Sequence, residues 1–288
     1  MQGTVDGFSY GVVTPLVAYL MACLGGALGL RCTTRAMLVA HSWRPAWLAL
    51  GSAAIGSGIW TMHFVAMMGF SVKETPIHYD KPLTYASLGL AIVMVGVGIF
   101  IVGYRGATGT ALFTGGTITG LGIASMHYLG MAGLRLNGTL QYDTVMVAAS
   151  VVIGVVAATS ALWAAGQVRG FLWSVGASLV MGLAVSGMHY TGMAALSVHL
   201  HGADVTSPGD SPASLLAPML IGPLAFLCLA AVVVIFDPLM VTGKPDQLRA
   251  AHKPGVPADE VTHHPSRRPQ LRVSRQQSHH SARTPQNR

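Results

Sequence analysis

Charged residues are scarce in this sequence. Only 9% of the 288 residues are Asp, Glu, Lys or Arg, whereas a soluble globular domain carries about 25%. Apolar residues make up 52% of the chain and lie in continuous runs, without the alternation of barrel strands. Helices are therefore the only spanning elements available. The composition indicates a polytopic membrane protein and excludes an ordinary soluble domain.

Cysteine is also scarce, and its three residues, Cys23, Cys32 and Cys228, lack the CxxC spacing of zinc sites. We interpret them as small apolar residues, not as disulfide partners or metal ligands. Oxygen-rich ligand sets for magnesium or calcium are missing as well, and so are Gly-rich phosphate loops and kinase motifs.

Seven apolar runs are long enough to cross a bilayer, which takes roughly 20 helical residues. They are rich in Gly and Ala, which let membrane helices approach closely. We predict an all-α fold, a seven-helix membrane bundle over residues 10–236 after a short extracytoplasmic N-terminus at residues 1–9. The predicted spans are Tyr10–Leu30, Trp47–Phe70, Leu83–Gly103, Thr108–Leu134, Thr144–Ala165, Phe171–Val198 and Ser214–Phe236.

Lysine and arginine set the predicted orientation, because cytoplasmic loops carry more of them. The first, third and fifth loops hold Arg31, Arg35, Arg44, Arg105 and Arg169, and nine more follow Phe236. The opposite side has only Lys73, Lys81 and Arg135. We therefore expect the N-terminus outside and the C-terminus in the cytoplasm. The polar, basic tail at residues 237–288 is predicted to be disordered and to suit an anionic membrane surface, with no nucleic-acid partner expected.

A threefold repeat is the most informative feature of the chain. His63, His127 and His189 are spaced by 64 and 62 residues, within the pattern G-x-[GA]-x-x-x-M-H-[FY]-x-[AG]-M. An aspartate precedes the first helix of each repeat, and an arginine ends it. Each unit therefore contains two helices, and three units inserted the same way round predict a pseudo-threefold six-helix bundle plus a seventh helix.

The motif places its histidine and its second methionine on one stripe of a helix that also carries the small residues. Small-residue stripes mark close helix packing, so this face is predicted to point into the bundle. All three histidines would lie at one depth, roughly 10 Å from the outer ends of their helices. Three converging imidazoles with thioether sulfur suit copper, especially Cu(I), and zinc is the alternative for the imidazoles alone.

The candidate metal ligands are the histidine and two methionines of each copy. They are Met62, His63, Met67, Met126, His127, Met131, Met188, His189 and Met193. Three aspartates, Asp6, Asp80 and Asp143, have two interpretations: they cap the helices that follow, or they orient the imidazoles from a second shell.

The copies "MHYLGM", "MHYTGM" and "MHFVAM" resemble the MHYT domain, a bacterial integral membrane sensor domain, over about residues 8–236. The first copy departs from the pattern, with Phe64 in place of tyrosine. The resemblance implies a bacterial plasma-membrane protein that binds copper through these residues and senses oxygen, carbon monoxide or nitric oxide. Family members often carry a cytoplasmic output domain. The polar residues after the last span are too few for one, so we expect a stand-alone sensor that is not an enzyme and that needs an output partner.

Two rival functions remain open. A haem-binding electron-transfer protein would use histidines from two helices as axial ligands, but it would need a large apolar slot. A copper or proton transporter would need polar groups across the whole membrane, and the inner halves of these spans offer little beyond Ser and Thr.

Overall fold

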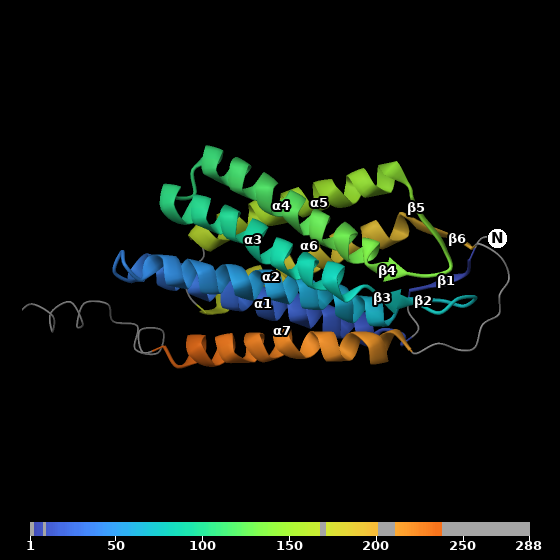
Figure 1. The fold of residues 1–288 in the computed structure, drawn as a ribbon. Coiled ribbons are helices and arrows are strands. Elements are labelled where there is room, and N and C mark those ends of the chain that lie inside the picture. Colours follow the sequence, from blue (N-terminus) through green and yellow to red (C-terminus); the bar gives the residue numbers. More distant parts are fainter. Residues whose placement is uncertain (1–2, 8–9, 168–170, 201–210, 238–288) are drawn as a thin grey trace, which may run out of the picture. The chain divides into compact units, whose positions relative to one another are not determined.

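A computed structural model describes residues 3–7, 10–167, 171–200 and 211–237 of the chain. It contains seven long helices, whose arrangement is drawn in Figure 1. They are α1 (Val13–Leu38), α2 (Arg44–Met68), α3 (Lys81–Arg105), α4 (Gly109–Ala132), α5 (Thr144–Gln167), α6 (Phe171–Ala194) and α7 (Pro212–Ile235). The predicted tail lies outside the described residues, except for Asp237.

The first six helices form a closed ring. Each helix packs against the next one along the chain, and α6 returns to pack against α1. The seventh helix lies outside this ring, against α2 and α1. Because α2 has neighbours on both the ring side and the α7 side, it is the most buried of the candidate spans. This arrangement agrees with three two-helix units followed by a separate helix.

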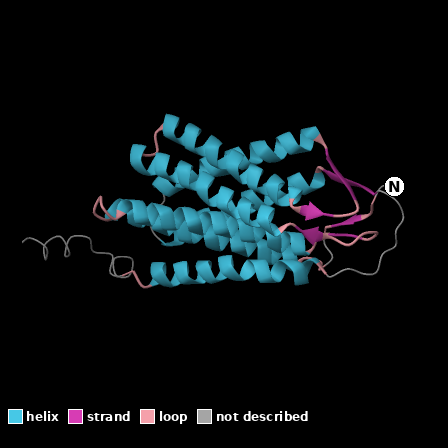
Figure 2. Ribbon diagram, in the orientation of Figure 1, coloured by secondary structure: helices cyan, strands magenta, loops and turns pink. Residues whose placement is uncertain are grey.

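Three short antiparallel sheets, which were not predicted from the sequence, gather at one end of the helices (Figure 2). Each sheet joins the strand before a unit's first helix to the strand after its second helix, so the unit is strand–helix–helix–strand. The pairs are β1 (Val5–Asp6) with β2 (Ser71–Val72), β3 (His78–Tyr79) with β4 (Leu134–Arg135), and β5 (Gly138–Tyr142) with β6 (Leu196–Leu200). Strands of two to five residues are too short to show a reliable alternating pattern.

Two predicted boundaries were wrong. The sixth span was expected to reach Val198, but α6 ends at Ala194 and the chain enters β6. The first loop was expected to hold Arg31 and Arg35, but both lie in the last turns of α1, which runs to Leu38. Apolar strand residues that follow a helix look like its continuation in sequence, because both elements are apolar at this end of the protein.

Six of the helices in the described residues are long and apolar enough to cross a membrane, so the chain is a multi-pass membrane protein. The exception is α4, whose length is sufficient at 24 residues. Its glycines and threonines lower its hydropathy. Several of these small residues, including Gly116 and Gly120, are buried against α5.

Close glycine contacts hold the first unit together. A β-carbon on Gly25 of α1 would lie 2.7 Å from Cα of Gly58 on α2, and one on Gly58 would lie 2.6 Å from Cα of Gly25. No side chain fits between backbones at this separation. The contact therefore fixes how closely α1 and α2 approach, and α2 carries the first motif histidine.

We predict that Gly25→Ala destabilises the folded protein by about 1–3 kcal/mol, because the added methyl group must push two backbones apart. Thermal unfolding in mild detergent measures the effect. Gly89→Ala is the matched control, since it adds the same group on α3 where nothing lies within 4 Å. Equal stability of both variants would contradict the close-contact interpretation.

Candidate metal centre

The three motif histidines occupy equivalent positions on alternate helices of the ring. His63 lies on α2, His127 on α4 and His189 on α6, each five residues before the last residue of its helix. That spacing corresponds to a depth of about 7.5 Å, a little less than predicted, because the helices end before the strands. The three residues are only 1%, 1% and 2% exposed. The predicted common depth and inward orientation are confirmed.

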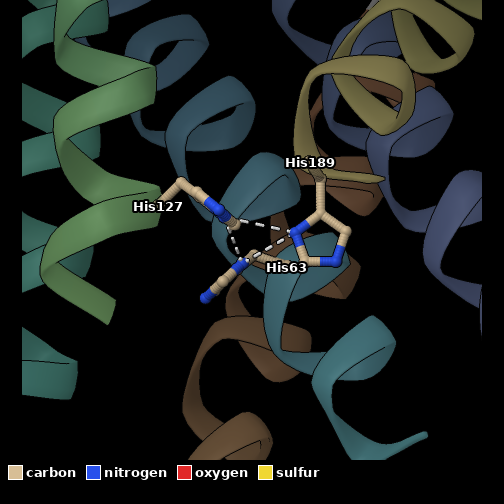
Figure 3. Close-up of side chains that lie close together, drawn as sticks. All are labelled: His63, His127 and His189. Atoms are coloured by element: carbon tan, nitrogen blue, oxygen red, sulfur yellow. Dashed lines mark hydrogen bonds between the residues drawn. The ribbon is translucent and has the colours of Figure 1, made fainter. Parts of the chain in front are cut away.

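The same nitrogen of each ring points to a common centre (Figure 3). Nδ1 of His63 lies 3.1 Å from Nδ1 of His189 and 3.1 Å from Nδ1 of His127. The third side of the triangle, between His127 and His189, is 3.3 Å long. The rings are nearly perpendicular to one another, with interplanar angles of 80–88°.

Hydrogen bonding alone cannot satisfy this triangle. In a neutral imidazole, each nitrogen either carries a proton or offers a lone pair. With three Nδ1 atoms in mutual contact, at least one pair must consist of two donors or two acceptors. A metal cation between three lone pairs removes the conflict. Tetrahedral coordination at a metal–nitrogen distance of about 2.0 Å implies nitrogen separations of about 3.3 Å, close to those observed.

The opposite nitrogens of two rings are sealed in the protein. Nε2 of His63 and Nε2 of His127 are buried without a hydrogen-bond partner among the described residues. A buried polar group left without a partner costs about 1–3 kcal/mol. Packing alone does not offset this cost, whereas the free energy of metal binding through Nδ1 does.

Glycines of the neighbouring unit form the seal. A β-carbon on Gly130 would lie 2.8 Å from Nε2 of His63, and one on Gly192 would lie 2.6 Å from Nε2 of His127. Both glycines stand three residues after a motif histidine, at the position that the sequence showed only as small. Their role in closing over the ring of another unit was missed, because sequence spacing does not show which units meet.

The aromatic residue after each histidine supports the imidazole edge-on. Ring centroids are 4.6 Å apart for His63–Phe64, 4.8 Å for His127–Tyr128 and 4.9 Å for His189–Tyr190, at angles of 73–81°. Phenylalanine serves this contact as well as tyrosine does, which explains how the first copy tolerates Phe64. The hydroxyl of Tyr128 has a separate partner, Oγ of Ser150, at 2.6 Å.

The motif methionines lie on the same helices as the triad, but their burial and neighbours differ. Met62, Met67, Met126, Met131 and Met188 are at most 1% exposed, and Met193 is partly buried. The side chain of Met188 packs on α5, where a β-carbon on Gly154 would lie 3.5 Å from its Cγ. Ligation by the sulfurs stays a prediction.

Two of the three aspartates cap helices. The amide of Leu83 donates to Asp80, and the amide of Met146 donates to Asp143. The Leu83 amide and the Arg135 guanidinium, which lies 3.0 Å away, hold the pKa of the Asp80 carboxyl below its usual value. Asp6 lies in β1. A second-shell role for these aspartates stays a prediction.

The cysteines are free thiols, with Cys23 and Cys32 buried and Cys228 exposed. The metal-ligating group found among the described residues consists of the three histidines, whose candidate ligand atoms all lie within 4.8 Å of one another.

Comparison with known proteins places this repeat in a family. The profile of the family MHYT, described as a bacterial signalling protein N-terminal repeat, matches residues 56–115 and 120–178. Each match begins at the glycine seven residues before a motif histidine. No solved structure matches the chain.

Curated relatives are signalling proteins. The bifunctional diguanylate cyclase/cyclic di-GMP phosphodiesterase MucR of Pseudomonas aeruginosa is 35% identical over 80% of this chain and 34% of its own length. The cyclic di-GMP phosphodiesterase NbdA of the same organism is 34% identical, over 68% and 26%. The signaling protein YkoW of Bacillus subtilis is 30% identical, over 70% and 26%. The chain thus spans about a third or less of the length of these relatives, and it belongs to the MHYT family of bacterial signalling repeats.

Proposed function

We propose that the chain is a membrane sensor module in which His63, His127 and His189 hold one copper ion. The observation that supports this proposal most strongly is the triangle of Nδ1 atoms, with sides of 3.1, 3.1 and 3.3 Å. Copper bound there would supply affinity for a small diatomic ligand such as oxygen, carbon monoxide or nitric oxide, or sensitivity to redox state. The protein supplies a water-poor site and fixes the three rings in position.

Copper is favoured over zinc by the surroundings of the triad. Imidazole binds both metals, and the order of divalent affinities places copper above zinc. Six motif methionines lie one or four residues from a histidine, and thioether sulfur favours Cu(I). No carboxylate belongs to the ligand group found among the described residues, so the site offers nothing to harder cations.

The geometry argues against both rival functions. Two axial histidines of a haem bind on opposite faces of a macrocycle, whereas here the nitrogens lie within 3.3 Å of one another. A transporter needs polar groups along its path. A cavity of about 40 Å³ inside the ring is lined instead by residues such as Ile59, Val95, Ile123 and Val185, and among the described residues only Thr33 and Thr119 add polar side chains to it.

The seventh helix offers a route for the signal to leave the bundle. It packs on α2, which carries His63, and just after its end Asp237 pairs with Nε of Arg35 on α1 at 2.8 Å. Both side chains are nearly buried, at 11% and 6% exposure, and the Arg35 guanidinium also lies over the Trp47 ring of α2. A shift of α2 would therefore be transmitted through Trp47 and Arg35 to Asp237, just after the end of α7.

In this proposal the membrane domain senses and does not catalyse. Its output is a cytoplasmic partner, as the cyclase and phosphodiesterase names of the longer relatives suggest. The arginine-rich side faces the cytoplasm, so the triad lies near the outer face of a bacterial plasma membrane.

A single centre predicts that the three histidines depend on one another. Purified protein should contain about one copper per chain, and His63→Ala, His127→Ala or His189→Ala should each remove most of it. Metal analysis of protein that remains monodisperse in mild detergent tests this. The control is His78→Ala, because His78 is an exposed residue of β3.

Three separate sites would give a different result. The stoichiometry would approach three, each variant would lose about a third of the metal, and the losses would add. That outcome would rule out the shared centre.

The sulfur prediction is tested by Met131→Leu and Met193→Leu, which keep side-chain volume and remove the sulfur. If the sulfurs are ligands, Cu(I) affinity should fall about tenfold or more, while Cu(II) affinity changes less. Met146→Leu is the control, because Met146 is an exposed residue of α5. Unchanged Cu(I) affinity in both test variants would assign these methionines to packing.

The orientation predicts which single cysteines are labelled from outside in intact cells. In a background without Cys23, Cys32 and Cys228, a membrane-impermeant maleimide should label Asn137→Cys and spare Gln167→Cys. Both positions are exposed: Asn137 lies between β4 and β5, on the side where α5 begins, and Gln167 is the last residue of α5. The reverse pattern would place the triad near the cytoplasmic face.

A further inference from the structure

The three interfaces between units are not equivalent. In two of them, a glycine three residues after a motif histidine closes over the ring of the preceding unit's histidine: Gly130 over His63 and Gly192 over His127. The threefold repeat assigns the remaining ring, His189, to the equivalent position of the first unit. That position holds Ala66. Alanine has a β-carbon, for which there is no room at the two equivalent glycines.

A cavity lies at this third interface. It has a volume of about 280 Å³, and its walls include Ala66 on α2 and His189 on α6. The rings of His63 and His127 have their Nε2 atoms buried against glycine backbone, but the His189 side chain lines this cavity. Among the described residues, the seal of the centre is therefore incomplete only beside His189.

The lining of the cavity defines the kind of molecule that fits it. Val5, Ala66, Phe70, Met193 and Ala194 contribute apolar walls. Among the described residues, only His189 and Tyr190 contribute polar side-chain groups. Such a lining does not replace the hydration shell of an ion, but it accepts a small uncharged molecule, and the volume exceeds the roughly 30 Å³ of one water molecule.

We propose that this cavity is the entry and binding site for the small uncharged ligand, which reaches the histidine triad past His189 and not past His63 or His127. The inference rests on the proposed function for the role of the ligand, but not for access to His189. The site is formed by the first and third units together, so the repeat builds one asymmetric opening out of three similar interfaces.

The first test uses metal-free full-length protein in mild detergent. Diethyl pyrocarbonate, followed by peptide mass spectrometry, should modify His189 at least about tenfold faster than His63 or His127, which react only after local opening. Exposed His78 gives the reference rate. Equal rates for the three triad histidines would overturn the proposal, and this comparison needs no variant.

A pair of matched substitutions locates the entry. Ala194 and Ala132 both stand five residues after a motif histidine, at the ends of α6 and α4, but only Ala194 lines the cavity. Ala194→Phe should slow modification of His189 about tenfold, and Ala132→Phe should leave it unchanged. The smaller Ala194→Leu gives the same direction if the phenylalanine variant does not fold. Equal effects at both positions would overturn the proposal.

The second test follows carbon monoxide binding to Cu(I)-loaded protein by infrared spectroscopy. Ala194→Phe should slow association about tenfold at unchanged copper content, whereas Ala132→Phe should not. Unchanged association in Ala194→Phe would refute the entry route. Absence of copper from the wild-type protein would instead refute the proposed function, and the pyrocarbonate rates would still report on the cavity.

Discussion

The structure depends on three histidine Nδ1 atoms that contact one another and cannot all be paired as hydrogen-bond donor and acceptor. Three imidazoles present the same nitrogen to one another at 3.1–3.3 Å, and each side chain is buried in the bundle. No arrangement of protons satisfies all three contacts, and Nε2 of His63 and Nε2 of His127 are buried with no hydrogen-bond partner in the part of the chain that the structure describes. The bundle holds the rings there nevertheless, through glycine backbones on one side and aromatic edges on another. A cation is the simplest compensation for this cost.

The sequence predicted the helices and the triad because both follow from periodicity. Apolar runs predicted all seven helices, with ends within a few residues except at the C-terminus of α1, and equal spacing from a shared motif predicted three histidines at one depth. The strands were missed because pairs such as β1 and β2 contain two residues each. The seals at Gly130 and Gly192 were missed for another reason: they act on the ring of a different unit, and a repeat does not say which neighbours meet.

Departures from the repeat carry as much information as the repeat itself. Phe64 makes the same ring contact with its histidine as the tyrosines of the other two copies do, so this substitution leaves the packing of the imidazole unchanged. Ala66 is different, because a β-carbon at the equivalent glycines would collide with an imidazole, and the cavity occurs where this residue stands. The first unit also differs in its connection to α7, through α2 and the buried Arg35–Asp237 pair. In the proposed account, the unit that lines the entry cavity is therefore also the unit whose two helices pack against α7.

The central claim is that the three Nδ1 atoms share one copper ion. X-ray absorption spectroscopy of the copper-loaded full chain tests it most directly. The account predicts about three nitrogen scatterers at about 2.0 Å with the multiple-scattering signature of imidazole, and loss of that signature in His127→Ala. A copper environment of oxygen scatterers alone, unchanged by His127→Ala, would contradict it.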